Sequence, residues 1–342
     1  EPEVDLVVLD ARAAVARDGH AIDPRAVRRL DEKARPVGEN ARIHGDVAHL
    51  GAVARGSVAL GGVGGGIADG LLEEGVLDRA ITCVETFDYD VVDKIYDPYD
   101  NLGLSVILHG DGTREYKVLG SLAEAVKAQS ADPKQWNRLK KIFASKSLQL
   151  VSFTITEKGY ALRDAKGEYF PFIRSDIDNG PDKASSAMAV VSALLYERFN
   201  TCKAPLAVVS MDNCSHNGEK LRNSITDMVG EWQKKGFVSE DFVQYVNDEN
   251  TISFPWSMID KITPRPADTV AESLKEAGVE DMDPVITSKR TYIAPFVNAE
   301  GPQYLVIEDR FPNGRPQLEK AGVYMTDRDT VNKVERMKVT TC

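Results

Sequence analysis

Short apolar segments alternate with longer amphipathic ones along most of this chain. Four runs rich in β-branched and aliphatic residues predict buried strands, at 81–85, 104–109, 148–156 and 204–211. Apolar residues spaced about 3.6 positions apart predict four helices, over 67–75, 121–128, 134–144 and 183–199. Strands that alternate with helices favour parallel pairing through helical crossovers. The pattern therefore predicts an α/β fold built on an open, mainly parallel sheet.

The two ends of the chain differ from its middle. Residues 1–45 carry alanine-rich and charged patterns that predict a helical N-terminal extension. The segment 328–342 begins as an amphipathic helix with Val331, Val334 and Met337 on one face. It then stops without a cap, a glycine or a polar tail. We therefore expect the sequence to be part of a longer polypeptide.

Composition and charge narrow the class of protein. Hydrophobic residues make up 42% of the 342 residues and charged residues 28%, which is typical of a globular protein with a large core. The formal net charge of −11 comes without a basic stripe, so nucleic acid is excluded as the main partner. No apolar run reaches the roughly 18–20 residues of a membrane span, and the acidic N-terminus lacks the layout of a secretory signal. We expect a cytoplasmic protein.

The four cysteines are scattered along the chain. They lie at positions 83, 202, 214 and 342, and they form no CxxC pair. This spacing indicates neither a structural zinc site nor a disulfide framework. The sequence predicts no metal site.

A glycine-rich stretch between 51 and 66 is a candidate phosphate loop. Glycines let backbone N–H groups approach an anion, and the following helix offers its positive end. Gly62 and Gly64 fit part of a GxGxxG pattern, but position 67 is Ile. Glu85 ends the next predicted strand, where a carboxylate binds the ribose 2′-hydroxyl and selects NAD. The alternative is a flexible loop beside an ordinary acid at a strand end.

Polar clusters follow two of the predicted strands. Thr154, Thr156 and Glu157 end one, and Asp212 and Asn213 end the other. In open α/β sheets the ligand crevice lies at the carboxyl ends of the strands. These clusters therefore mark a candidate site, although Asp, Asn, Ser and Gly in the second one also suit an Asx turn.

Five further positions could carry chemistry or be structural. His216 could be a ligand or an acid/base group, or simply a solvated side chain in a polar turn. Asp260 and Lys261 stand among apolar residues, as either a buried ion pair or part of a site. Glu335 and Lys338 share a helix face at i,i+3. They form either a surface ion pair or a site in which the lysine exchanges a proton.

Four motifs in order resemble the long-chain mannitol dehydrogenase family. They are LVSFTITEKGY (150–160), PLAVVSMDNCSHNGEKL (205–221), SFPWSMIDKITP (253–264) and KVERMK (333–338). Within that family, VETFDYDVVDKIYDPYDNL and ALRDAKGEYFPF are most similar to the fructuronate reductase (mannonate oxidoreductase) group. Together the four motifs span residues 150 to 338.

The resemblance implies a fold and a domain plan. A Rossmann-type open sheet with helices on both faces is expected over 46–326, with insertions. Residues 327–342 would be the first helix of a mainly α-helical C-terminal domain, and the active site would lie between the two. The family has a Gly-x-Gly turn after its first strand, for which either Gly51 or the later glycine run is the candidate counterpart.

The resemblance also assigns roles to residues. Lys338 matches the family's catalytic lysine and Glu335 the acid before it. Asn213 matches the asparagine that holds the substrate oxygen, and Asp260 matches the site aspartate. Lys261 is a secondary substrate candidate beside His216. The family pattern continues past the lysine with an asparagine and a histidine, and this sequence ends before either.

The expected function is zinc-independent hydride transfer between a nicotinamide cofactor and a sugar acid. NAD is expected rather than NADP, and the substrate pair is expected to be of the fructuronate/mannonate type. Alternatives are mannitol/fructose, tagaturonate/altronate, or a non-catalytic dinucleotide- or sugar-binding protein. No nucleic acid or membrane is expected as a partner, and the oligomeric state stays open. The cofactor-binding candidates are Gly51, Gly62, Gly64, Glu85, Thr154, Thr156 and Glu157.

Overall fold

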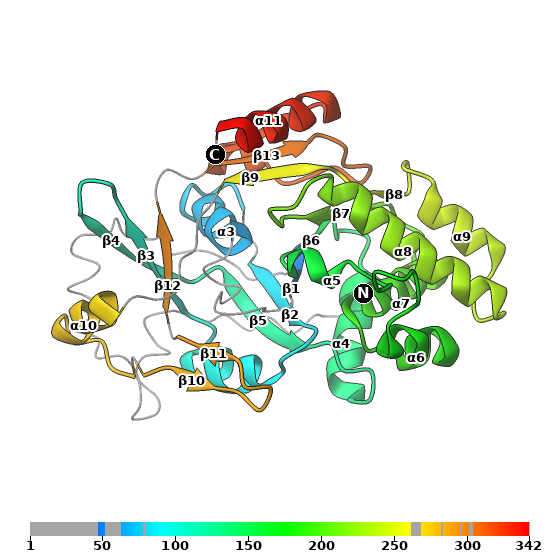
Figure 1. The fold of residues 1–342 in the computed structure, drawn as a ribbon, viewed down its shortest axis with the longest axis horizontal. Helices are drawn as coiled ribbons and strands as arrows, with labels where there is room; N and C mark the ends of the chain where they lie inside the picture. Colours follow the sequence, from blue (N-terminus) through cyan, green and yellow to red (C-terminus); the bar gives the residue numbers. More distant parts are fainter. Residues whose placement is uncertain are drawn as a thin grey trace.

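A computed structural model describes residues 47–51, 63–77, 80–260, 268–281, 283–294, 296–300 and 304–341 (Figure 1). The predicted helical extension at 1–45 lies outside the described residues, as do Gly62 and Lys261. Three sheets and a two-stranded hairpin make up the β structure of the described part.

A six-stranded parallel sheet forms the centre of the fold. Its spatial order is β5-β2-β1-β6-β7-β8, which in chain order reads 3-2-1-4-5-6. This is the strand order of dinucleotide-binding Rossmann folds, as the family resemblance implies. The strands are β1 (Val47–Gly51), β2 (Ile81–Glu85), β5 (Leu122–Lys127), β6 (Leu150–Phe153), β7 (Leu206–Ser210) and β8 (Ile252–Ser253).

Alternate residues of these strands face two different layers. Val151 and Val208 pack into the largest hydrophobic cluster, whereas Leu150 and Val209 pack into another on the opposite face. Helices cover the first face, namely α4 (Pro133–Phe143), α6 (Pro171–Asn179), α7 (Ala187–Thr201), α8 (Asn217–Lys234) and α9 (Glu240–Asn247). Helix α3 (Val63–Glu73) and a small sheet cover the second.

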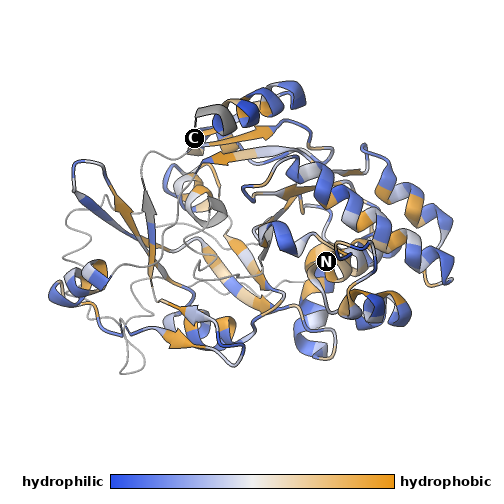
Figure 2. Ribbon diagram, viewed as in Figure 1, coloured by the Kyte–Doolittle hydropathy of each residue, from blue (hydrophilic) through white to orange (hydrophobic). Residues whose placement is uncertain are grey.

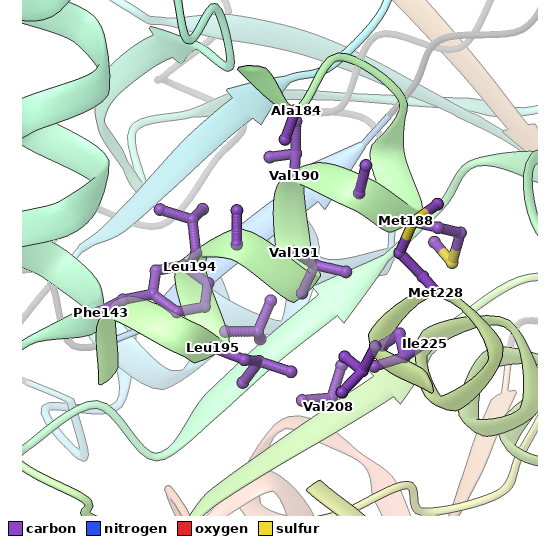
Figure 3. Packing of buried hydrophobic residues seen from close by; sticks show 14 of the residues in the cluster. Phe143, Ala184, Met188, Val190, Val191, Leu194, Leu195, Val208, Ile225 and Met228 are labelled. Atoms are coloured by element: carbon purple, nitrogen blue, oxygen red, sulfur yellow. The ribbon is translucent and has the colours of Figure 1, made fainter. Parts of the chain in front are cut away.

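Helix α7 is the centre of the largest cluster. Its residues from Met188 to Leu195 are all buried, because the helix lies between the sheet and its neighbours α4 and α8. Figure 3 shows Val191 and Leu195 of α7 close to Val208 of β7 and Ile225 of α8. The outer helices α8 and α9 instead alternate hydrophilic and hydrophobic residues along their length, as expected when only one face is buried (Figure 2).

The end of α7 holds the starts of two central strands. The Arg198 guanidinium is fully buried and donates to five backbone carbonyl groups, those of residues 143, 145, 148, 204 and 205. All of them lie in the segments that lead into β6 and β7. Burial lowers the pKa of Arg198, and the carbonyl oxygens supply the partners that a desolvated cation needs.

A second sheet contains strands from distant parts of the sequence. Its order is β12 (Phe296–Glu300), β3 (Gly103–Leu108) and β4 (Arg114–Leu119). The predicted strand at 104–109 is therefore confirmed, but it belongs to this smaller sheet. Helix α10 (Asp268–Glu276) packs on it, and the hairpin β10 (Val285–Ile286) and β11 (Tyr292–Ile293) precedes β12.

The third sheet supports the last helix. It consists of β14 (Val323–Thr326), β13 (Tyr304–Glu308) and β9 (Ser257–Asp260), and α11 (Arg328–Thr341) lies against β9 and β13 (Figure 1). The predicted C-terminal helix is thus confirmed. Val331 is fully buried and Val334 half-buried, whereas Met337, predicted on the same face, is 65% exposed.

One predicted element is wrong. Residues 121–128 were expected to be a helix, and they form strand β5. The buried residues Leu122 and Val126 are four positions apart, a spacing that suits both one face of a helix and one face of a strand. Parallel pairing with β2 decides for the strand.

Candidate active site

Three predicted site residues from distant segments meet, because Asp260 and Asn213 both contact the side chain of Lys338. The Lys338 ammonium Nζ lies 3.1 Å from Asp260 Oδ1 and 3.3 Å from Asn213 Oδ1. It also donates to the backbone carbonyl of Ile259 at 2.6 Å. Only 17% of the lysine side chain is exposed. The ammonium is therefore held at the junction of β7, β9 and α11.

The packing of α11 brings Lys338 to this junction. Val331 and Val334 pack against Met258 of β9 and Val306 of β13. At the start of the helix, Arg328 Nε pairs with Glu308 Oε1 at 3.1 Å. Two turns beyond Val331, the same helix face reaches the carboxyl end of β9.

A buried asparagine fixes β7 against β9. Asn217 Nδ2 donates to the carbonyl groups of Asp212 at 3.0 Å and Ser257 at 2.9 Å, and its Oδ1 accepts from Ser257 N–H at 3.1 Å. Asn217 is 1% exposed. It stands four residues after Asn213, so it sets the distance between that residue and the start of β9. The sequence gives no signal for this role, since Ser257 lies 40 residues away.

A second buried group joins the ends of β6 and β7. The Asp212 carboxylate accepts the N–H groups of Ile155 at 2.8 Å and Thr156 at 2.9 Å, and the Tyr160 hydroxyl at 2.5 Å. The predicted alternative of a purely local Asx turn is therefore insufficient. Burial raises the pKa of Asp212, and burial together with the Asp212 charge raises that of Tyr160 well above its usual value. Tyr160 therefore stays a neutral donor.

The polar cluster after β6 consists of Thr154, Thr156 and Glu157. Thr156 begins the short helix α5 (Thr156–Gly159) with a φ of 62°, a left-handed conformation that its N–H bond to Asp212 supports. Glu157 is exposed and pairs with Lys220 of α8. Thr154 is half-buried between β6 and α5.

Glu335 of α11 contacts the connection between β7 and α8, which carries His216. The Glu335 carboxylate accepts from the Ser215 hydroxyl and from the backbone N–H of His216, the latter at 3.2 Å. The His216 ring lies against Trp256 at an interplanar angle of 31°, with 4.6 Å between centroids, and its Nδ1 is 3.6 Å from Glu219 Oε2. The contacts of Glu335 and Lys338 to other elements contradict the interpretation of the two as a simple surface pair.

The cofactor candidates occupy the other side of the carboxyl edge. Gly51 ends β1 and pairs in register with Glu85 at the end of β2. Gly64 lies in the first turn of α3. Glu85 is 2% exposed, and its Oε1 accepts the N–H groups of Phe87 at 2.8 Å and Asp88 at 3.1 Å. Burial raises the pKa of Glu85 to about 7, and the charge of Asp88 adds to this.

Two classes of feature are absent from the described residues. Nowhere in that part of the chain do three or more His, Cys, Asp or Glu side chains gather in a way that could hold a metal ion. The helices in the same residues are too short or too polar to cross a bilayer.

Comparison with known proteins places this geometry in a family. A family model described as the mannitol dehydrogenase Rossmann domain matches residues 65–320. D-mannonate oxidoreductase of Thermotoga maritima is 52% identical over 267 residues, which cover 78% of this chain and 49% of that protein. Polyol:NADP oxidoreductase of Gluconobacter oxydans is 30% identical over 63% of this chain and 40% of its own length.

A solved structure agrees with the fold. The ternary complex of Pseudomonas fluorescens mannitol 2-dehydrogenase with NAD and D-mannitol superposes with a TM-score of 0.71 and 26% sequence identity. The match covers 89% of this chain and 57% of that one. The chain spans at most about half the length of the two sequence relatives. The strand order, the arrangement around Lys338 and these matches together show that the chain belongs to the mannitol dehydrogenase family.

Proposed function

We propose that this chain carries the cofactor site and the proton-transfer residues of an NAD-dependent oxidoreductase. Its reaction would interconvert a keto-sugar acid and the corresponding hydroxy acid, of the fructuronate/mannonate type. The observation that carries this proposal is the convergence of Asn213 and Asp260 on the Lys338 ammonium. The 52% identity to a D-mannonate oxidoreductase supports the choice of substrate.

The described residues fit a nicotinamide dinucleotide. The 3-2-1-4-5-6 strand order creates the crevice in which such cofactors bind. Gly51 at the end of β1 has no side chain to keep a pyrophosphate away, and Glu85 is its direct neighbour on β2. NAD is the expected cofactor, with NADP the weaker one. When bound, NAD would accept or supply the hydride.

The protein residues would move the proton. During reduction the Lys338 ammonium would donate a proton to the oxygen that gains negative charge, and during oxidation the lysine would take that proton back. Once the substrate oxygen replaces Asn213 Oδ1 beside the ammonium, the amide Nδ2 of Asn213 would donate to that same oxygen. Such a donor is worth about 10²–10³ in rate. Asp260 orients the ammonium and would bind neighbouring hydroxyl groups.

The remaining expectations belong to the same proposal. Glu85, Thr154, Thr156 and Glu157 would line the cofactor side, and Glu335 would adjust the surroundings of Lys338. A small sugar acid or polyol would be the partner in the cytoplasm, with no nucleic acid or membrane. The domain boundaries at 46–326 and 327–342 also remain predictions. The Gluconobacter relative, named for polyols and NADP, makes polyol oxidation the second candidate.

Replacement of the lysine tests the function. In the full-length protein, Lys338→Ala should lower kcat for NAD-dependent oxidation of mannonate by about 10²–10⁴, the usual contribution of general acid–base catalysis. The affinity for NAD should stay the same, and an added small primary amine should restore part of the rate. Stopped-flow and steady-state assays measure these effects.

A matched control separates catalysis from helix stability. Lys333 is exposed on the same helix, so Lys333→Ala should leave kcat unchanged. Assays with mannonate, altronate and mannitol rank the substrates. A wild-type protein that binds NAD but oxidises none of them would support the non-catalytic binder. A Lys338→Ala protein with near-normal kcat would remove the proposed mechanism.

A further inference from the structure

An exposed aromatic side chain lies just past the carboxyl end of β2. Phe87 follows Glu85 by two residues and is 53% exposed. In a sheet of this order, the adenosine half of a dinucleotide lies at that end of the second strand. The ring is therefore placed where a purine base would be bound.

The turn that carries Phe87 is pinned from within. Glu85 Oε1 accepts the N–H groups of Phe87 and Asp88, at 2.8 and 3.1 Å. Asp88 itself is fully buried, so residues 85 and 88 face inward while residue 87 faces out. The exposure of Phe87 thus follows from a defined turn rather than from a loose end.

A hairpin from the far end of the sequence docks on the same turn. Thr287 Oγ1 donates to Asp88 Oδ2 at 2.6 Å, and the Ser288 N–H donates to Asp90 Oδ2 at 2.7 Å. These bonds place the tip of the β10–β11 hairpin beside β2, nearly 200 residues away in sequence. Lys289 at that tip lies with its Nζ 5.0 Å from the centroid of the Phe87 ring.

We propose that Phe87, held by Lys289, is the edge of the cofactor site that binds the adenine ring. The Lys289 ammonium over the ring is a cation–π contact that fixes the ring orientation. The remaining exposed surface of Phe87 offers a flat apolar face on which a purine stacks. Phe87 is thus a cofactor-binding residue and Lys289 a positioning residue. This inference rests on the proposed NAD cofactor.

The adenosine half of the cofactor provides the test. We would measure binding of ADP-ribose and NAD to the full-length protein by calorimetry, for Phe87→Ala, Phe87→Trp and Lys289→Ala. Loss of base stacking should raise the Kd of Phe87→Ala for both ligands by about 5- to 100-fold. Phe87→Trp should keep wild-type affinity, and Lys289→Ala should raise the Kd a few-fold.

Controls keep the two proposals separate. Tyr324 on β14 is also exposed, at 64%, so Tyr324→Ala reports the effect of removing an aromatic ring elsewhere and should leave both Kd values unchanged. In mannonate oxidation, Phe87→Ala should raise the KM for NAD in parallel with its Kd. If Phe87→Ala binds ADP-ribose with wild-type affinity while mannonate is still oxidised, Phe87 does not bind the adenine ring. The proposed oxidoreductase function is then unaffected. If the wild type binds neither ADP-ribose nor NAD, the proposed NAD cofactor is wrong, and the adenine site is wrong with it.

Discussion

The Lys338 ammonium has three hydrogen-bond donors and meets three oxygen acceptors. The Ile259 carbonyl at 2.6 Å and the Asp260 carboxylate at 3.1 Å both belong to β9, whereas Asn213 at 3.3 Å follows β7. We expect a substrate oxygen to take the place of one of these acceptors. The Asn213 contact is the longest, so we expect the substrate to enter between the lysine and the asparagine.

Glu85 makes a prediction about pH. Its pKa is about 7 in the folded protein against 4.5 for a free glutamate, because the carboxyl group is buried. The folded state therefore holds the proton more tightly, and its stability falls as the pH rises from about 4.5 to 7. In Glu85→Gln this loss is absent. The free energy of unfolding of the variant should gain up to about 3 kcal/mol on wild type across that interval.

Urea unfolding at pH 4.5, 6 and 8 measures this gain. Glutamine keeps the carbonyl oxygen that accepts from Phe87 and Asp88, so the turn stays bonded. A stability difference that does not change with pH would show that folding leaves the pKa of Glu85 unshifted.

At the scale of elements, hydrophobic periodicity correctly predicted the strands and helices whose buried residues follow a single clear period. The strands β2 and β7 and the helices α4 and α7 lie within a few residues of their predicted positions. The prediction for β5 was wrong because apolar residues four positions apart suit both a helix and a strand. Only the pairing of this segment with β2 distinguishes the two.

The candidate site was predictable only for residues to which the family resemblance assigns a role. Lys338, Asn213 and Asp260 were found through the family resemblance, and the structure brings them together. The supporting roles of Asn217 and Tyr160 were not found. A residue that supports others through distant hydrogen bonds leaves no periodic signal in the sequence.

The start of α8 carries a prediction of its own. A Cβ at Gly218 would lie 2.7 Å from the Phe254 carbonyl oxygen and 2.7 Å from Trp256 Cδ1. Gly218→Ala must therefore push α8 away from the connection to β9. We expect a loss of about 1–3 kcal/mol in the free energy of unfolding.

Gly230 in the same helix provides the control. A Cβ there meets nothing within 4 Å, so Gly230→Ala should raise stability by up to about 1 kcal/mol through helix propensity. Denaturant unfolding of both variants compares the two sites directly. A stabilised Gly218→Ala protein would show that the close approach is not rigid.

On the scale of the whole molecule, the hydrophobic interior is divided unequally. The cluster around α7 extends over the main sheet and five helices, whereas the cluster under β3, β12 and α10 is far smaller. Because local stability follows buried apolar contacts, different parts of the protein should open at different free energies.

Hydrogen exchange should show this division. Amide protons of α7 and β7 should exchange most slowly, through near-global unfolding, and those of β3, β4 and β12 should exchange earlier. Mass spectrometry of peptic fragments measures the two rates in one experiment. Equal protection of β3 and β7 would indicate a single cooperative unit instead.

The pairing of β12 with β3 has a consequence for building chimaeras. These strands are separated by almost 190 residues, yet they share five register pairs, and the β10–β11 hairpin is bonded to the turn after β2. Transplanting residues 86–119 alone from a relative would leave β3 with a foreign neighbour or an open edge, which invites aggregation. The segments 86–119 and 268–300 therefore form one structural unit from two parts of the sequence, and they should be exchanged together.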